Sequence, residues 1–144
     1  MPSWSEVETE APELAALARS YFDAFTHKTL ATLRRDGSPR ISGTEVEFAD
    51  GELWFGSMWR AVKALDLLRD PRFALHSGSA DPSGWTGDAK VAGRAEEVTG
   101  QESTSHRFRA DIIELVVVHL GEPADHIVIE SWHEGRGLSR KERR

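Results

Sequence analysis

The sequence contains no cysteine, which excludes disulfide bonds, thiolate nucleophiles and zinc sites built from cysteine. It also lacks the run of about 18 apolar residues that a membrane-spanning helix needs. The first residues are acidic, without the basic start and apolar core of a signal peptide. The formal net charge of -6 is opposite in sign to that of a general nucleic-acid-binding face. We therefore expect a cytoplasmic protein with neither nucleic acid nor membrane as a partner.

Several common catalytic motifs are also missing. The sequence has no G-x-S-x-G, no P-loop and no G-x-G-x-x-G, which argues against hydrolase, P-loop and Rossmann sites. His119, His126 and His133 lie seven residues apart, but they fall on two expected strands and a turn rather than on one helix face. This spacing matches no metal motif, so we expect ordinary hydrogen-bonded histidines and no metal site.

What is present is one helix followed by mostly β segments. At 144 residues the chain fits a single domain, expected to span residues 1–144. Apolar side chains at steps of three and four predict a helix over residues 12–25 and a second one over residues 60–69. The expected buried face of the first helix consists of Leu14, Leu17, Tyr21 and Phe25. That of the second consists of Ala61, Val62, Ala64, Leu65 and Leu68.

Turn signals divide the rest of the chain into short strands. Asp36-Gly37 and Asp50-Gly51 are typical of hairpins, and a change of apolar phase near Ile112-Ile113 predicts a bulge. The expected strands cover residues 30–33, 41–48, 52–56, 73–77, 89–98, 108–120 and 126–132. Residues 134–144 are mainly charged and are expected to form a solvated end. Six or seven such strands predict a small antiparallel barrel, a mainly β fold with few helices.

The segment between the third expected strand and the second helix carries the clearest binding signal. Free amide groups and the helix dipole make a helix N-terminus attract anions. Ser57 adds a hydroxyl and Arg60 and Lys63 add two cations there, with Met58 and Trp59 between them. This pattern favours a phosphate site. The alternative is a solvated helix start in which Ser57 is an ordinary N-cap.

Tryptophan side chains are candidates for contact with a flat aromatic ring. Trp54 alternates with apolar neighbours in an expected strand, which favours packing in the core or in a dimer interface. Trp59, Trp85 and Trp132 lie outside such a pattern. For Trp85 and Trp132, ring contact and packing both remain open.

A long apolar run near the end of the chain predicts a homodimer. Residues 112–120 are apolar at nearly every position, which implies burial on both faces of a strand. A two-fold partner would cover such a surface. It would also bring Trp132 and His133 of one chain towards Lys63 of the other.

Three stretches resemble a known family when they are taken in order. They are LATLRRDGSP at residues 30–39, KALDLLRDPR at residues 63–72 and VAGRA at residues 91–95. With them the chain resembles the pyridoxamine 5'-phosphate oxidase-like superfamily, well over residues 29–98 and more loosely through Trp132. The resemblance implies a split β-barrel that binds FMN or a deazaflavin, with the dimer partner completing the ring pocket.

The resemblance assigns roles to three positions in this sequence. Lys63 is similar to the family lysine that meets the cofactor phosphate. In pyridoxamine phosphate oxidases proper, an Arg and, five residues on, a Lys also reach this phosphate, whereas this chain has Ser42 and Glu47 there. The Ser42 pattern resembles the deazaflavin-dependent branch, which uses coenzyme F-420. Some FMN-binding members also lack the Arg and the Lys, so both cofactors stay open.

The function that the resemblance implies is hydride transfer between a bound cofactor and a small substrate. The expected cofactor is coenzyme F-420 or FMN, and the expected substrate is a conjugated or heteroaromatic compound. No catalytic acid or base can be named from the sequence. Two alternatives remain: an FMN-dependent protein related to pyridoxamine 5'-phosphate oxidase, and a non-catalytic carrier of flavin or haem.

Overall fold

Strands make up most of the chain in the computed structural model, which describes residues 2–79, 83–98 and 104–144. The helices are α1 (Trp4–Glu10), α2 (Pro12–Ala24) and α3 (Val62–Arg69). The strands are β1 (Lys28–Leu33), β2 (Pro39–Thr44), β3 (Val46–Ala49), β4 (Glu52–Met58), β5 (Arg72–His76), β6 (Gly87–Glu97), β7 (Ser105–Leu120), β8 (Ile127–His133) and β9 (Gly137–Arg143). The predicted mainly β fold class is confirmed, with more strands than the sequence indicated.

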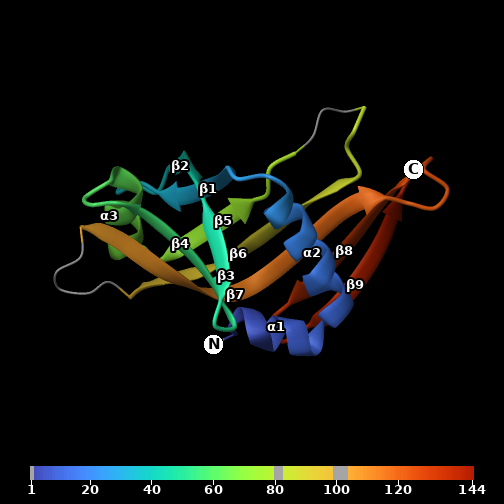
Figure 1. Cartoon of the computed structure of the whole chain (residues 1–144), viewed down its shortest axis with the longest axis horizontal. Helices are drawn as coiled ribbons and strands as arrows, with labels where there is room; N and C mark the ends of the chain where they lie inside the picture. Colours follow the sequence, from blue (N-terminus) through green and yellow to red (C-terminus); the bar gives the residue numbers. More distant parts are fainter. Residues whose placement is uncertain (1, 80–82, 99–103) are drawn as a thin grey trace.

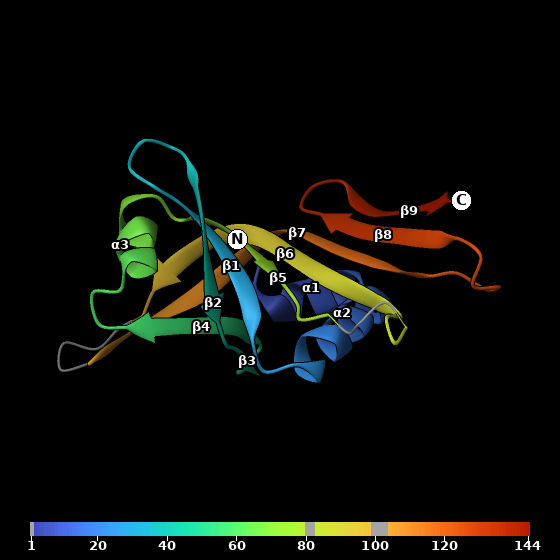
Figure 2. The same cartoon turned by 90° about the horizontal axis from the view of Figure 1, so that it is seen from above.

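All the strand pairings in the described chain are antiparallel, and β7 connects two parts of the sheet. The main path runs β2-β1-β5-β6-β7-β4-β3, and β8 and β9 continue from the other half of β7. The first residues of β7 pair with β4, and its last residues pair with β8. As a result, α3 and the β8–β9 hairpin lie at opposite ends of the molecule (Figures 1 and 2).

Two hairpin turns form where the sequence predicts them. Gly37 has φ +85°, and Asp50 and Gly51 have φ 54° and 74°. Consecutive left-handed residues define the two-residue turn whose twist matches that of paired strands. The Asp50-Gly51 turn joins β3 to β4, and the Asp36-Gly37 turn joins β1 to β2.

One predicted strand proves to be two. Residues 41–48 are divided at Glu45 into β2, which pairs with β1, and β3, which pairs with β4. The apolar and polar pattern continues across the division, so the sequence alone gives no sign of it. Ser42 and Glu47 therefore belong to different hairpins.

Two elements at the ends of the chain were missed. Helix α1 begins with a capping box in which Ser3 and Glu6 exchange hydrogen bonds, and it buries Trp4 and Val7. The charged segment expected to be a solvated end forms β9 instead, although every residue of β9 is exposed. Its backbone pairs with β8, and this pairing requires no apolar side chains.

Helices α1 and α2 cover one side of the sheet, mainly over β6 and β7 (Figure 1). The buried residues of α2 are Leu14, Ala15, Ala18 and Phe22. This face is rotated from the predicted one, because the small side chains of Ala15 and Ala18 allow the helix to approach the sheet closely. Phe25, expected in the core, is 40% exposed.

The predicted bulge in the long apolar strand is confirmed. The register between β6 and β7 shifts between Ala92 and Gly93, which leaves Ile113 without a partner on β6. A Cβ on Gly93 would lie 1.9 Å from the carbonyl oxygen of Asp111, so the close approach requires glycine. Val117 is completely buried within the chain itself, so it is not available as an interface residue.

Candidate functional site

The turn between β4 and α3 differs from the helix start that the sequence predicts. The helix begins at Val62, two residues later than expected, and Ala61 takes the N-cap position without a side-chain cap. Ser57 is therefore not the cap: it lies in β4, and its hydroxyl donates to the carbonyl oxygen of Met58 at 3.2 Å. Arg60 adopts a left-handed conformation with φ 59°.

Helix α3 is anchored by a buried carboxylate instead of an apolar stripe. Asp66 Oδ2 accepts hydrogen bonds from Thr32 Oγ1 and Arg40 Nε, both at 2.8 Å, and Asp66 Oδ1 accepts one from Arg69 at 3.2 Å. Burial alone would raise the pKa of Asp66, but the three donors together hold that pKa below its ordinary value.

This anchor rotates α3 relative to the predicted orientation. Ala64 is buried as predicted, together with Asp66 and Leu67, whereas Val62, Leu65 and Leu68, which were also expected in the core, are about half exposed. The exposed set on and beside the helix consists of Met58, Trp59, Val62, Leu65 and Leu68. An apolar surface of this kind is typical of an interaction face.

Lys63 lies in a cavity of about 750 Å³ formed by β2, β4, the start of β7 and α3. Its Nζ donates to the carbonyl oxygen of Gly43 at 2.7 Å. Burial lowers the pKa of the Lys63 ammonium from its ordinary value. The hydroxyl-bearing residues Thr44, Ser57, Thr104 and Ser105 also line the cavity, and Glu45 is the one carboxylate among the described lining residues.

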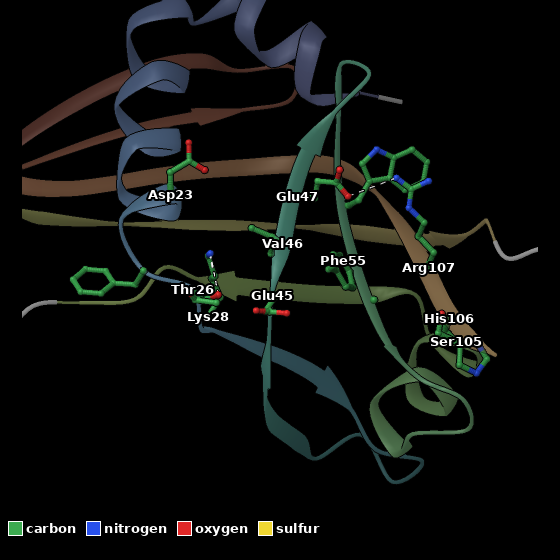
Figure 3. A pocket seen from close by; sticks show the side chains of 13 residues that line it. Asp23, Thr26, Lys28, Glu45, Val46, Glu47, Phe55, Ser105, His106 and Arg107 are labelled. Carbon is green, nitrogen blue, oxygen red and sulfur yellow. Dashed lines mark hydrogen bonds and ion pairs between the residues drawn. The ribbon is translucent and has the colours of Figure 1, made fainter. Parts of the chain in front are cut away.

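A second cavity, of about 610 Å³, adjoins the first. Glu45, Gly56, Ser105 and His106 line both of them. Figure 3 shows the second cavity between β3, β4, β7 and the segment that connects α2 to β1. A Cβ on Gly56 would lie 2.9 Å from the carbonyl oxygen of His106, so the wall between β4 and β7 requires a residue without a side chain.

In the second cavity, Arg107 faces Glu47, and Lys28 bonds a backbone carbonyl. The guanidinium of Arg107 lies 3.6 Å from the ring centroid of Trp54 and 4.0 Å from Glu47 (Figure 3). Lys28 Nζ donates to the carbonyl oxygen of Thr26 at 3.1 Å. Glu47 thus faces Arg107 in this second cavity and does not line the cavity of Lys63.

His106 is a residue that the sequence analysis did not single out. It is 4% exposed, and its Nδ1 lies 2.7 Å from Glu97 Oε1. Its Nε2 accepts a hydrogen bond from the backbone N–H of Arg60 at 3.2 Å. Trp59 stacks on its ring, with 4.6 Å between the ring centroids and 9° between the ring planes. No local motif indicates this cluster, because the register of β6, β7 and β4 alone brings these residues together.

The structure places the predicted site residues in two groups. Ser57, Met58 and Lys63 line one cavity, and Trp59 and Arg60 form the adjoining turn. Ser42 lies half-buried in β2, next to the Gly43 whose carbonyl accepts from Lys63.

The other three predicted residues lie elsewhere. Trp85 Nε1 donates to Asp88 at 3.1 Å, and Trp132 is buried with its Nε1 donating to Glu10 at 2.9 Å. His133 Nε2 lies 2.9 Å from Glu114 Oε2. Strand β8, which carries Trp132 and His133, is at the opposite end of the molecule from α3 (Figures 1 and 2).

Two further properties concern the described part of the chain as a whole. Among residues 2–79, 83–98 and 104–144, no three His, Asp or Glu side chains are grouped to hold a metal ion. None of the three described helices is long and apolar enough to cross a membrane.

Comparisons with known proteins identify the family and the fold. A family profile described as pyridoxamine 5'-phosphate oxidase matches residues 14–127. A comparison with curated proteins gives no significant match.

Three solved structures show the same fold. A pyridoxamine 5'-phosphate oxidase-related, FMN-binding protein from Nostoc punctiforme is 13% identical, with a TM-score of 0.65 over 96% of both chains. PhzG from Burkholderia lata, solved with tetrahydrophenazine-1-carboxylic acid, is 10% identical, with a TM-score of 0.66 over 98% of this chain and 93% of that one. An F-420 reductase is 16% identical, with a TM-score of 0.56 over 67% of this chain and 94% of that one.

Proposed function

Because the chain belongs to the pyridoxamine 5'-phosphate oxidase family, we propose that it is an oxidoreductase that holds a phosphorylated flavin-type cofactor beside Lys63. The observation that carries the proposal is the half-buried ammonium of Lys63 in its cavity between two strands and a helix. When bound, a flavin or deazaflavin supplies hydride transfer to a small conjugated or heteroaromatic substrate. The chain's own residues bind and orient the cofactor.

The residues around Lys63 fit a phosphorylated group of this size. A volume of about 750 Å³ lies within the range of about 300–1,000 Å³ that ligand sites occupy. Lys63 contributes a cation, and Ser57 and Ser105 contribute hydroxyl donors. Glu45 opposes an anion, so Lys63 has to supply most of the attraction.

We propose the deazaflavin coenzyme F-420 as the preferred cofactor. Ser42 and Glu47 stand where FMN-specific relatives carry cations, and Glu47 is directed towards Arg107. The chain thus offers Lys63 as its main cation to the phosphate. The absence of cations at Ser42 and Glu47 therefore favours the deazaflavin over FMN. The solved structures of similar fold include both an FMN-binding protein and an F-420 reductase.

We propose further that the active unit is a homodimer. Lys63 lies on α3 and His133 lies on β8, two elements at opposite ends of one chain, so a two-fold axis can place Lys63 of each protomer beside His133 of its partner (Figure 1). The exposed apolar face around α3 provides a surface for this contact. In this arrangement His133 of the partner, which is partly exposed, completes the wall of the Lys63 cavity, whereas Trp132 stays buried within its own chain.

Native mass spectrometry of the purified protein, followed by parallel titrations with FMN and F-420, tests the cofactor proposal. Retention of neither cofactor, and no saturable binding of either, would refute it. Clearly tighter binding of FMN would instead assign the protein to the FMN-dependent alternative.

Two substitutions test the position of the phosphate. A charge-assisted hydrogen bond contributes about 1.5–3 kcal/mol, and Lys63 has to give up its bond to Gly43, so Lys63→Met should weaken binding about tenfold. Glu45→Gln removes a repulsive charge and should strengthen binding. Lys90→Met on the exposed face of β6 is the matched control and should change nothing. Equal affinities for all four proteins would place the phosphate elsewhere.

A further inference from the structure

The turn from β4 into α3 depends on a hydrogen bond from another part of the sheet. Arg60 has φ 59°, a conformation that residues other than glycine rarely adopt. Ala61 at the N-cap has no side-chain oxygen with which to cap the helix. The backbone N–H of Arg60 instead donates to His106 Nε2 at 3.2 Å, from the start of β7.

Glu97 fixes the tautomer of His106 that can accept this bond. A nitrogen that accepts an N–H carries no proton, so the ring proton of His106 resides on Nδ1. Glu97 Oε1 lies 2.7 Å from Nδ1 and accepts that proton's hydrogen bond. Glu97 ends β6, so the pairing of β6 with β7 sets the donor and acceptor pattern of the ring.

Stacking keeps the imidazole in one orientation. Trp59 packs on His106 with ring centroids 4.6 Å apart and an angle of 9°, and Phe108 lies 6.1 Å away at 18°. With two aromatic rings stacked near it and a hydrogen bond at each nitrogen, His106 holds both Trp59 and Arg60 in place. It is 4% exposed, so water does not compete for these contacts.

The geometry points to His106 as a positioning residue for the phosphate site, acting through the turn on Lys63. Lys63 follows Arg60 by three residues, so the conformation of Arg60 sets the direction in which Lys63 leaves the first turn of α3. The observed direction brings Lys63 Nζ to 2.7 Å from the carbonyl oxygen of Gly43, inside the cavity. The inference rests on the proposed function, because the ligand is the phosphorylated end of the cofactor.

Two conservative substitutions distinguish the role of His106 Nε2 from that of Nδ1. In His106→Gln the amide oxygen can reach the position of Nε2 and accept from Arg60. In His106→Asn the amide can replace Nδ1 as a donor to Glu97 but is too short to reach Arg60. His119→Asn is the matched control, because His119 also lies on β7 and its Nε2 is 2.7 Å from a glutamate, Glu130.

Fluorescence titration with FMN and with riboflavin, which lacks the phosphate, provides the first measurement. His106→Asn should weaken FMN binding about tenfold, the loss expected from one misplaced charged contact, and should leave riboflavin within about twofold of wild type. His106→Gln should stay within about threefold for both ligands, and His119→Asn should match wild type. If the protein retains F-420 instead of FMN, the two ligands compared in the titration are F-420 and its phosphate-free chromophore.

Hydrogen exchange at the Arg60 amide of the cofactor-free protein provides the second measurement. The amide should lose protection in His106→Asn and keep it in His106→Gln. The inference is overturned if FMN and riboflavin weaken equally, if His106→Asn binds FMN like wild type, or if the Arg60 amide stays protected. If wild type binds no flavin or deazaflavin at all, the proposed function fails and the cofactor role of His106 fails with it. If wild type binds the cofactor normally and one of those three results is obtained, only the inference about His106 fails.

Discussion

Replacing Asp66 with alanine should destabilise the protein by about 3 kcal/mol, because this carboxylate connects α3 to β1 and β2. The hydroxyl of Thr32, which is 2% exposed, loses its partner, and an unsatisfied buried donor costs about 1–3 kcal/mol. Arg40 and Arg69 are 27% and 30% exposed and can turn to water, so each adds only about 0.5 kcal/mol. The sum is a large part of the 5–15 kcal/mol that typically stabilises a domain.

Urea unfolding followed by circular dichroism measures this loss. Asp23→Ala is the control, because Asp23 forms an exposed ion pair with Arg19 on α2 and its removal should cost less than about 0.5 kcal/mol. Asp66→Asn should fall between the two, since an amide oxygen can still accept from Thr32. If Asp66→Ala costs no more than Asp23→Ala, the buried carboxylate is not what anchors α3.

Four further predictions follow from the same structure. The depressed pKa of Asp66 contributes stability that is complete above the unfolded-state value near 3.8 and is lost as the pH falls through the folded-state value, so Asp66→Asn should flatten acid unfolding in this range. Because burial lowers the pKa of Lys63 from 10.5, its ammonium loses its proton as the pH rises, before the pH reaches 10.5. The ratio of FMN to riboflavin affinity should therefore fall as the pH rises towards 10.5, and it should be flat in Lys63→Met. Gly93→Ala should cost about 3 kcal/mol or more in urea unfolding, and a change within experimental error would contradict the close contact at the bulge. Leu65→Arg, at a position 46% exposed, should give a folded monomer by light scattering, whereas Val117→Arg, at a fully buried position, should unfold the chain; a dimeric Leu65→Arg protein would exclude the α3 face as the interface.

Features that depend on neighbouring residues could be predicted from the sequence. The turns at Asp36-Gly37 and Asp50-Gly51 form because glycine, and to a lesser extent aspartate, accepts left-handed dihedrals, as Gly37, Asp50 and Gly51 do here. The bulge near Ile113 follows from the local change of apolar phase. The mainly β fold class follows from these turns and the strands between them, and the family follows from the three stretches that resemble it.

Features that depend on pairing between distant residues could not be predicted from the sequence. The division at Glu45 reflects which strand each half pairs with, and the local pattern is the same on both sides. The predicted buried face of α3 was right for Ala64 but wrong for its larger apolar side chains, because the helix instead buries Asp66. That carboxylate accepts hydrogen bonds from Thr32 and Arg40, far away in the sequence. His106 and Glu97 meet only through the register of β6 and β7, so no spacing along the chain indicates them.

Strand β9 has a bearing on how the protein behaves at high concentration. Within the described part of the chain it pairs only with β8, so its other edge, seven residues long, presents backbone groups that no described strand pairs with. An open edge of this length is a template for adding strands from other molecules, which is the first step of aggregation. The sequence GLSRKER places adjacent charges at Arg140, Lys141, Glu142 and Arg143, so a second β9 approaching edge to edge would meet several cations of its own kind. The charged end thus acts as a gatekeeper that keeps the sheet from growing beyond one molecule at this edge.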